Sequence, residues 1–122
     1  MKQIKLLVKT NSQRYPIIIG SNLISNISGL LKKNSIKFQK ILIVVDNKVP
    51  KKFVNIIKKS LYKSKSNFFF INANEKNKNQ KTINNILNLL LEKNFSRKDC
   101  LITLGGGITG DLGGFAASLF KR

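Results

Sequence analysis

The chain contains 122 residues, of which 42% are hydrophobic, and its formal net charge at pH 7 is +18, with one cysteine and no histidine. This length gives one compact domain with a hydrophobic core and excludes two ordinary domains. The missing histidines exclude the commonest metal ligand and general base. No apolar run reaches the length of a membrane span, and the amino end does not resemble a signal peptide. We therefore expect a cytoplasmic protein without a membrane partner.

The positive charge is compatible with nucleic-acid binding, because clustered Lys and Arg release counterions from phosphates. The lysines, however, are scattered over every predicted element, and only Arg14, Arg97 and Arg122 are arginines. No base-stacking aromatic motif accompanies them. The abundance of Lys, Asn and Ile is typical of an A/T-biased coding sequence. We expect no specific nucleic-acid partner, and a basic nucleic-acid-binding domain remains a remote alternative.

The first residues predict a β-hairpin and a helix. Apolar residues alternate with lysines over residues 4–9, and residues 15–19 supply a second strand after a polar turn. Ser21 is expected to cap the helix that follows. The apolar positions of this helix, at helical spacing, are Leu23, Ile27, Leu30 and Leu31.

Strands and helices then alternate to the end of the chain. The continuous apolar run 41–45 ends at Asp46 and predicts a strand buried on both faces, and Pro50 suits the first turn of the next helix. Residues 67–71 predict a strand, and residues 72–79 a polar loop. A helix with Ile83, Ile86, Leu87, Leu90 and Leu91 on one side, a polar break at 94–99 and a strand at 100–104 come next. This order predicts a Rossmann-like α/β domain with a mainly parallel sheet and an N-terminal β-hairpin.

Two further features have ordinary structural interpretations. Cys100 begins a predicted buried strand and is expected to be a small core residue, because no histidine is available to activate it. Phe68, Phe69 and Phe70 are expected to alternate between the two covered faces of the sheet.

Residues 104–118 read LGGGITGDLGGFAAS and hold six of the eight glycines of the chain. Gly105, Gly107 and Gly110 match the pattern G-x-G-x-x-G, directly after a predicted strand and at the start of a predicted helix. Bare backbone lets a pyrophosphate approach, and the amides at the helix start favour an anion. The alternative is a tight turn followed by close helix packing, which is the simplest role for Gly113 and Gly114.

The acidic residue that usually follows such a glycine turn by about 20 residues would lie beyond the last residue of this sequence. Asp46 and Glu75 each follow a predicted strand and, with Asp111, make three of the five acidic residues. The carboxyl ends of parallel strands share one edge of a sheet, so we expect these acids and the glycine turn to line one crevice. Helix capping and loop solvation are the alternative roles for each acid alone.

The motif LGGGITGDLGGFAASLFKR resembles the signature of the 3-dehydroquinate synthase family of sugar-phosphate cyclases. NEKNK is similar to the Gly-Glu-x-x-Lys loop of that family, except that Asn74 replaces the usual Gly; Asn tolerates a left-handed backbone better than most residues. The resemblance covers the whole chain but only the first third of the usual family length. Residues 1–122 are therefore expected to form the N-terminal nucleotide-binding domain, truncated at its C-terminal end and without the family's helical, metal-binding second domain.

The resemblance also implies a set of binding residues. Those expected to hold NAD are Asp46, Asn47, Glu75, Lys78, Gly106, Gly107, Gly110 and Asp111. Of these, Glu75 is expected to accept hydrogen bonds from the ribose, and the glycines to carry the pyrophosphate. Arg122 matches an arginine that binds the anionic groups of the substrate.

The family is a phosphorus–oxygen lyase of the shikimate and chorismate pathway, which leads to aromatic amino acids. The resemblance implies a homodimer that converts the phosphorylated keto acid DAHP to 3-dehydroquinate with loss of phosphate. It also implies the use of NAD and of a divalent metal (zinc or cobalt) held by one Glu and two His. Because this chain has no histidine, we expect no metal ligand and no catalytic residue in it, and no activity from it alone. The alternatives are another sugar-phosphate cyclase and a truncated, non-catalytic relic.

Overall fold

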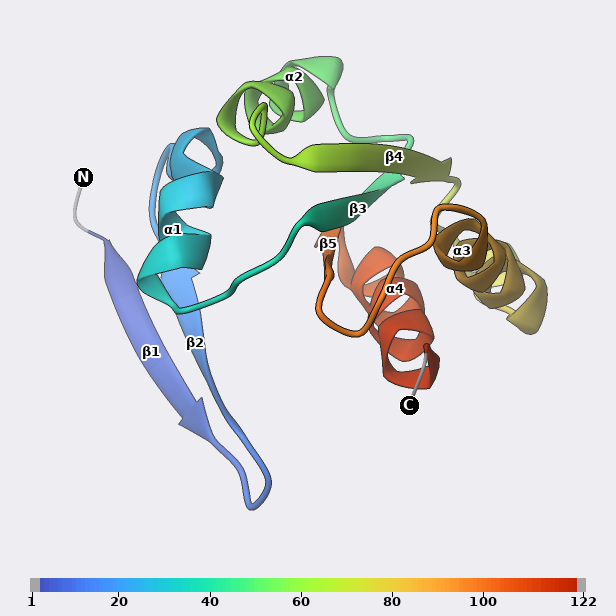
Figure 1. Cartoon of the computed structure of the whole chain (residues 1–122), viewed down its shortest axis with the longest axis horizontal. Helices are drawn as coiled ribbons and strands as arrows, with labels where there is room; N and C mark the ends of the chain where they lie inside the picture. Colours follow the sequence, from blue (N-terminus) through green and yellow to red (C-terminus); the bar gives the residue numbers. More distant parts are fainter. Residues whose placement is uncertain (1–2, 121–122) are drawn as a thin grey trace.

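A parallel sheet and a separate hairpin form the β-structure of the computed structural model, which describes residues 3–120. The antiparallel hairpin pairs β1 (Ile4–Lys9) with β2 (Arg14–Ile19). The parallel sheet contains β3 (Lys40–Asp46), β4 (Lys65–Ile71) and β5 (Cys100–Leu104), in the order β4-β3-β5. The predicted α/β class, with its parallel sheet and N-terminal hairpin, is confirmed (Figure 1).

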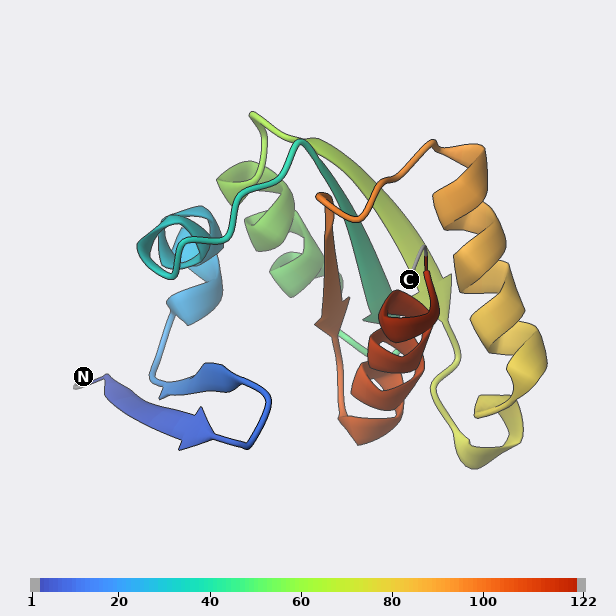
Figure 2. The same cartoon turned by 60° about the horizontal axis from the view of Figure 1, so that its bottom comes forward.

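Helices cover both faces of the parallel sheet. The helical elements are η1 (Leu23–Asn26), α1 (Ile27–Lys33), α2 (Lys51–Ser60), η2 (Glu75–Asn77), α3 (Gln80–Glu92) and α4 (Gly107–Leu119). Figures 1 and 2 show α2 on one side of the sheet and α3 and α4 on the other, with α1 between the hairpin and the sheet. This arrangement has the three layers that right-handed strand–helix–strand connections produce.

The central strand β3 is the most deeply buried part of the fold. Its five residues from Ile41 to Val45 are all 0% exposed. Ile41, Ile43 and Val45 pack in the cluster with α2, whereas Leu42 and Val44 pack with α3 and α4. A strand covered on both faces has to be apolar at every position, which explains the uninterrupted ILIVV run. Each such side chain contributes about 1.5–3 kcal/mol through its burial.

The first helical segment differs from its prediction. A short 3-10 turn, η1, precedes α1, and the residue before η1 is Asn22 rather than Ser21; neither η1 nor α1 has a side-chain hydrogen bond at its N-cap. The prediction of a single helix is therefore wrong, because a 3-10 turn and a short α-helix take its place. The apolar residues of this segment still face the core, because Ile24, Ile27 and Leu31 pack against the α2 side.

The end of α3 is also different from the predicted pattern. Leu91 is 57% exposed, and Phe95, in the predicted polar break, is only 2% exposed. Asn94 adopts φ 57°, and the N–H groups of Asn94 and Phe95 bond the carbonyls of Leu91 and Leu90 at 3.1 and 3.0 Å. These two bonds form a Schellman C-cap, which turns the chain back and buries Phe95 against Leu90 in the core.

Asp99 joins the starts of β3 and β5. One carboxylate oxygen accepts the backbone N–H of Lys40 at 3.0 Å, and the other accepts the backbone N–H of Ser96 at 2.9 Å. Burial by itself raises the pKa of Asp99, but the hydrogen bonds from backbone N–H groups and from the Ser96 hydroxyl outweigh it and hold the pKa below its usual value. The ionised carboxylate therefore stabilises the folded state.

Replacing this carboxylate tests its contribution. We expect Asp99→Asn to lower the free energy of unfolding near pH 7 by about 1 kcal/mol, since charge-assisted hydrogen bonds are lost at a partly solvated site. The folded pKa is depressed, so the advantage of the unsubstituted chain is fully present above the unfolded pKa of about 3.9 and shrinks as pH falls below it. Urea unfolding between pH 3 and 7 measures both effects. Glu92→Gln, an exposed acid at the end of α3, is the control, and an equal loss in both variants would contradict this role.

Candidate functional site at the carboxyl edge of the sheet

Hydrogen bonds bring the loops after β3 and β4 together at the carboxyl edge of the sheet. The backbone N–H of Asn47 donates to the carbonyl of Ile71 at 2.8 Å, and the Asn47 side-chain amide donates to Oδ1 of Asn72 at 2.8 Å. The amide of Asn77 then donates to the carbonyl of Asn72 at 2.9 Å. The expected convergence of these two loops is therefore present in the structure.

Gly105 brings the glycine turn against the end of β3. This residue has φ 154°, and a Cβ added to it would lie 2.6 Å from Oγ1 of Thr109 and 3.1 Å from Cβ of Asp46. Asp46 is therefore a neighbour of the turn, as the sequence predicts. Oδ1 of Asp46 also accepts the backbone N–H of Lys48 at 3.1 Å, which orients the carboxylate at the strand end.

The next glycines face open space. A Cβ added to Gly106, Gly107 or Gly110 would meet no atom within 4 Å. Helix α4 begins at Gly107, and its N-cap, Gly106, provides no side-chain hydrogen bond. The first backbone N–H groups of a helix have no carbonyl partner within it, and they lie at the positive end of the dipole of this 13-residue helix. The glycines leave no side chain over this end of α4 at Gly106 and Gly107. This cradle fits the pyrophosphate of a dinucleotide.

An ion pair places the loop after β4 beside α4. Nζ of Lys78 lies 3.2 Å from a carboxylate oxygen of Asp111, and the two side chains are 44% and 64% exposed. A pair so exposed contributes little to stability. It does partly neutralise Asp111, which would otherwise repel an anion at the helix start.

Of the remaining predicted residues, Glu75 is exposed at the start of η2, in the same loop as Lys78, and Arg122 lies outside the described residues.

Asn74 has a different role from the one suggested by its replacement of Gly. Its φ is −146°, so the backbone is extended and does not need a left-handed conformation. Its side-chain Oδ1 accepts the N–H of Asn77 at 2.9 Å and caps η2. Asn74 therefore does not adopt the left-handed backbone that we expected it to tolerate, and a capping hydrogen bond orders the loop instead.

The glycines further along α4 divide into two kinds. A Cβ on Gly113 would collide with Cγ2 of Thr103 and lie 3.2 Å from Cδ2 of Leu101, so this glycine lets α4 pack closely on β5. The packing interpretation is confirmed for Gly113. Gly114 is exposed, and a Cβ there would meet no atom within 4 Å, so close packing does not explain it.

Thr109 is the site residue that sequence reasoning missed. It is 0% exposed, and within residues 3–120 its Oγ1 is the buried side-chain polar atom that has no hydrogen-bond partner. It lies directly under the turn, beside Gly105. The pattern G-x-x-G leaves this position unspecified, so nothing in the sequence marked it.

Cys100 is partly buried. Its burial, and to a smaller extent the charge of Asp99, raises the pKa of its thiol, which suits an inert core residue.

Across residues 3–120, no helix is long and apolar enough to cross a membrane. The same residues contain no cluster of three or more His, Cys, Asp or Glu side chains that could hold a metal ion.

Comparisons with known sequences point to one family. Residues 68–122 match the family model described as 3-dehydroquinate synthase N-terminal. The chain is 53% identical over 122 residues to the 3-dehydroquinate synthase of Pelagibacter ubique (strain HTCC1062), covering all of this chain and 33% of that protein. It is 36% identical over 127 residues to that of Prochlorococcus marinus (strain MIT 9215), covering 100% of this chain and 34% of that protein. The chain thus spans about a third of the length of these relatives.

A comparison with solved structures agrees on the fold. A structure of 2-deoxy-scyllo-inosose synthase complexed with carbaglucose-6-phosphate, NAD+ and Co2+ superposes with a TM-score of 0.85 at 18% sequence identity. The match covers 98% of this chain and 32% of that chain. At this identity the likeness establishes the fold, including the hairpin.

Removing the unpaired hydroxyl of Thr109 tests the geometry of the turn. We expect Thr109→Val to raise the free energy of unfolding of the unliganded chain by about 1 kcal/mol, because a buried oxygen without a partner carries a desolvation cost that a methyl group of similar shape does not. Thermal or urea denaturation measures the change. The control Thr82→Val removes a hydroxyl that does bond, to Oδ1 of Asn79 at 3.2 Å, and is expected to be neutral or destabilising. A loss of stability in Thr109→Val would show that the hydroxyl is satisfied.

Proposed function

We propose that this chain, which is homologous over its whole length to the N-terminal third of 3-dehydroquinate synthases, is the NAD-binding domain of such a synthase. The observation that carries the proposal is the glycine turn at the start of α4, which is open at Gly106, Gly107 and Gly110 and has Asp46 at its base. A bare turn after a parallel strand, with a helix N-terminus behind it, binds the pyrophosphate of dinucleotides.

In this proposal the amides of the first turn of α4 donate hydrogen bonds to the pyrophosphate. The added negative charge is tolerated because Lys78 already pairs with Asp111 at the rim. Asp46 and Glu75 accept hydrogen bonds from ribose hydroxyls, the role that acids at strand ends take in Rossmann-like sites. Asn47 holds the loops after β3 and β4 together through its bonds to Ile71 and Asn72, so it orients the nucleotide-binding edge.

The whole enzyme is proposed to convert DAHP, a phosphorylated keto acid, to 3-dehydroquinate with loss of phosphate in the cytoplasm. NAD supplies the acceptor and later donor of a hydride. The family also uses a divalent metal, zinc or cobalt, but residues 3–120 offer no group of three or more His, Cys, Asp or Glu side chains that fits it. Residues 1–122 alone are proposed not to complete the reaction, and Arg122 is proposed to contact the substrate phosphate in the whole enzyme.

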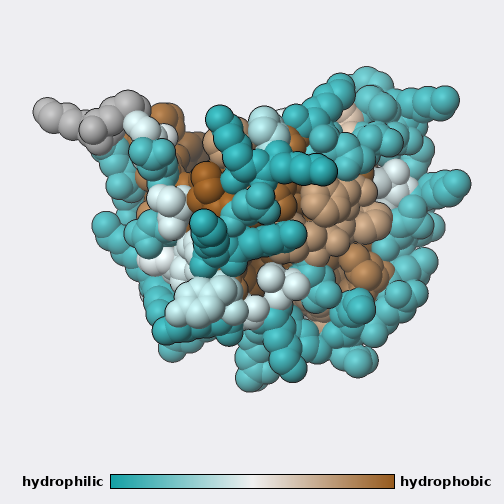
Figure 3. All heavy atoms as spheres, turned by 90° about the horizontal axis from the view of Figure 1, so that it is seen from above, coloured by the Kyte–Doolittle hydropathy of each residue, from teal (hydrophilic) through white to brown (hydrophobic). Residues whose placement is uncertain are grey.

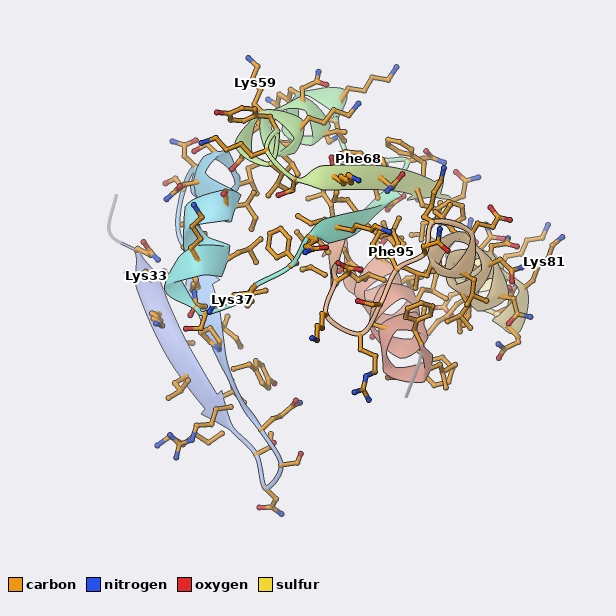
Figure 4. The ribbon with its side chains drawn as sticks, in the orientation of Figure 1. Lys33, Lys37, Lys59, Phe68, Lys81 and Phe95 are labelled. Carbon is orange, nitrogen blue, oxygen red and sulfur yellow. The ribbon has the colours of Figure 1, made fainter. Side chains whose placement is uncertain are left out.

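Sequence identity favours 3-dehydroquinate synthase over another sugar-phosphate cyclase as the enzyme to which this domain belongs. Identity to 3-dehydroquinate synthases is 53% and 36% for the two relatives described above, against 18% for 2-deoxy-scyllo-inosose synthase. Nucleic-acid binding has no comparable support. Figure 4 shows Lys33 and Lys37 together at one end of α1, Lys59 on α2 and Lys81 on α3, in three different regions of the molecule. A protein that follows a phosphate backbone gathers its cations in one stripe instead.

A second copy of the chain is proposed to cover the outer face of the hairpin. The pairs Ile4–Ile19, Leu6–Ile17 and Val8–Tyr15 place six uncharged, largely apolar side chains on one face. Five of the six are 42–53% exposed. Copies with a net charge of +18 repel each other over most of their surfaces. This uncharged face is where two copies can meet about a two-fold axis without bringing cations together.

The dinucleotide site is tested by substituting two glycines of the same helix. We expect Gly110→Val to weaken NAD binding by at least about tenfold, or about 1.4 kcal/mol, because its side chain would fill the cradle. Gly114→Val, which also points into open space, should leave the affinity unchanged. Isothermal titration of the purified chain with NAD gives the dissociation constants. If the unsubstituted chain binds no NAD, or both variants bind equally well, the nucleotide-binding role is wrong.

The hairpin interface is tested by two neighbouring residues of β1. Leu6 is 51% exposed on the outer face, and Leu7 is 53% exposed on the opposite face, opposite Pro16. We expect light scattering to give about twice the chain mass of 13.8 kDa for the unsubstituted protein. Leu6→Glu should give the single-chain mass, because it buries a charge at the interface, and Leu7→Glu should stay dimeric. A monomeric unsubstituted chain, or equal effects of the two variants, would contradict this interface.

A further inference from the structure

A groove lies between α2 and the edge strand β4, on the face of the sheet opposite to α3 and α4. Its volume is about 460 Å³, and the residues that line it include Asn47, Lys51, Val54, Asn55, Lys58 and Phe70. This volume is within the range of small-molecule sites, about 300–1,000 Å³. Figure 3, which looks down on α2 and β4, shows a hydrophobic patch exposed among hydrophilic side chains on this side of the molecule.

Aromatic rings form the β4 side of the groove. The register pairs Phe68 with Ile43 and Phe70 with Val45, so both rings are on the face that α2 covers. The ring centroids are 6.4 Å apart with an interplanar angle of 21°, and Phe70 is 47% exposed. The expectation that all three phenylalanines lie under covered faces is therefore wrong for Phe70. The reason is that α2 packs over the central strand β3, which leaves the edge strand partly uncovered.

Cations and amides form the α2 side of the groove. Nζ of Lys58 lies 5.1 Å from the centroid of the Phe68 ring, and Lys51 lies two helical turns earlier on the same helix. Asn55 lies between them, and Asn47 is at the end of the groove next to β3. The residues that line the groove include no Asp or Glu. Its electrostatic potential is therefore positive beside an open aromatic surface.

We propose that this groove binds a small, planar aromatic anion. The ring of the ligand stacks on Phe70, where an exposed aromatic face is otherwise in water. Its carboxylate or phosphate group is held by the ammonium groups of Lys51 and Lys58, and the amides of Asn47 and Asn55 fix its orientation. Neither an aliphatic anion nor a neutral aromatic molecule satisfies both sides of the groove.

The groove and the glycine turn lie on opposite faces of the sheet, and Asn47, directly after β3, borders both sites. Along β3, Asp46 alternates with Val45, so its side chain is on the α4 face, where its Cβ borders the glycine turn. The ring of Phe70 and the side chains of α2 are on the other face. Ligand binding in the groove therefore does not require the glycine turn, and Gly110→Val is expected to leave it unchanged.

The probe for this site is 2-naphthoate, a fluorescent aromatic carboxylate, titrated against the full 122-residue chain at physiological salt. We expect saturable binding that Phe70→Ala and Lys58→Gln each weaken by at least about fivefold. The matched controls are Tyr62→Ala and Lys63→Gln, which change a Lys-over-ring pair at 5.8 Å outside the groove, with Tyr62 74% exposed. These controls should bind 2-naphthoate as the unsubstituted chain does.

Two further ligands define the specificity. 2-Naphthalenemethanol, which has the ring without the charge, and cyclohexanecarboxylate, which has the charge without the aromatic ring, should both bind at least about tenfold more weakly than 2-naphthoate. Lys58→Glu, an exposed substitution, reverses the charge without touching the core and should abolish binding if Phe70→Ala fails to fold. The proposal is overturned if 2-naphthoate does not bind, if the Tyr62 and Lys63 controls lose as much affinity as the groove variants, or if either comparison ligand binds equally well.

Discussion

The complete burial of β3 is the constraint on which the rest of this structure depends. Residues 41–45 are 0% exposed because helices cover the sheet on both sides. A parallel strand in this position pairs with neighbours on both edges, so its register determines which residues of β4 and β5 end beside Asp46. The loops after the three strands therefore meet at one edge, so the candidate site, with Asp46 at the end of β3, depends on the burial of this strand.

The glycine-rich segment combines closely packed and open backbone within ten residues. Gly105 and Gly113 have no space for a side chain, because Thr109 and Asp46 surround the first and Thr103 and Leu101 surround the second. Gly106, Gly107 and Gly110 have open space where a side chain would be. The first set holds α4 against β5, and the second set leaves the start of α4 accessible. The density of glycines reflects these two separate requirements, since each would be met by fewer glycines alone.

The two faces of the sheet are covered differently, and this difference gives them different chemistry. On one face, α3 and α4 bury Ile71 and leave a small, backbone-lined cradle at the strand ends. On the other, α2 is centred on β3 and leaves Phe70 exposed beside two lysines. Most of the positive charge is spread over separate solvated surfaces, so charge matters at the few places where geometry concentrates it, such as Lys78 beside Asp111.

Hydrophobic periodicity and glycine spacing are local properties, so the amino-acid sequence alone predicts the order of strands and helices, the parallel sheet, the hairpin and the position of the glycine turn. It also placed Asp46 and the Lys78 loop at the correct edge. Four features were visible only in the folded molecule: the partners of Asp99, which bonds Lys40 from 59 residues away, the buried hydroxyl of Thr109, the inward turn of Phe95 and the exposure of Phe70. Each of these depends on contacts between segments far apart in the chain, and such contacts leave no periodic signal in either segment alone.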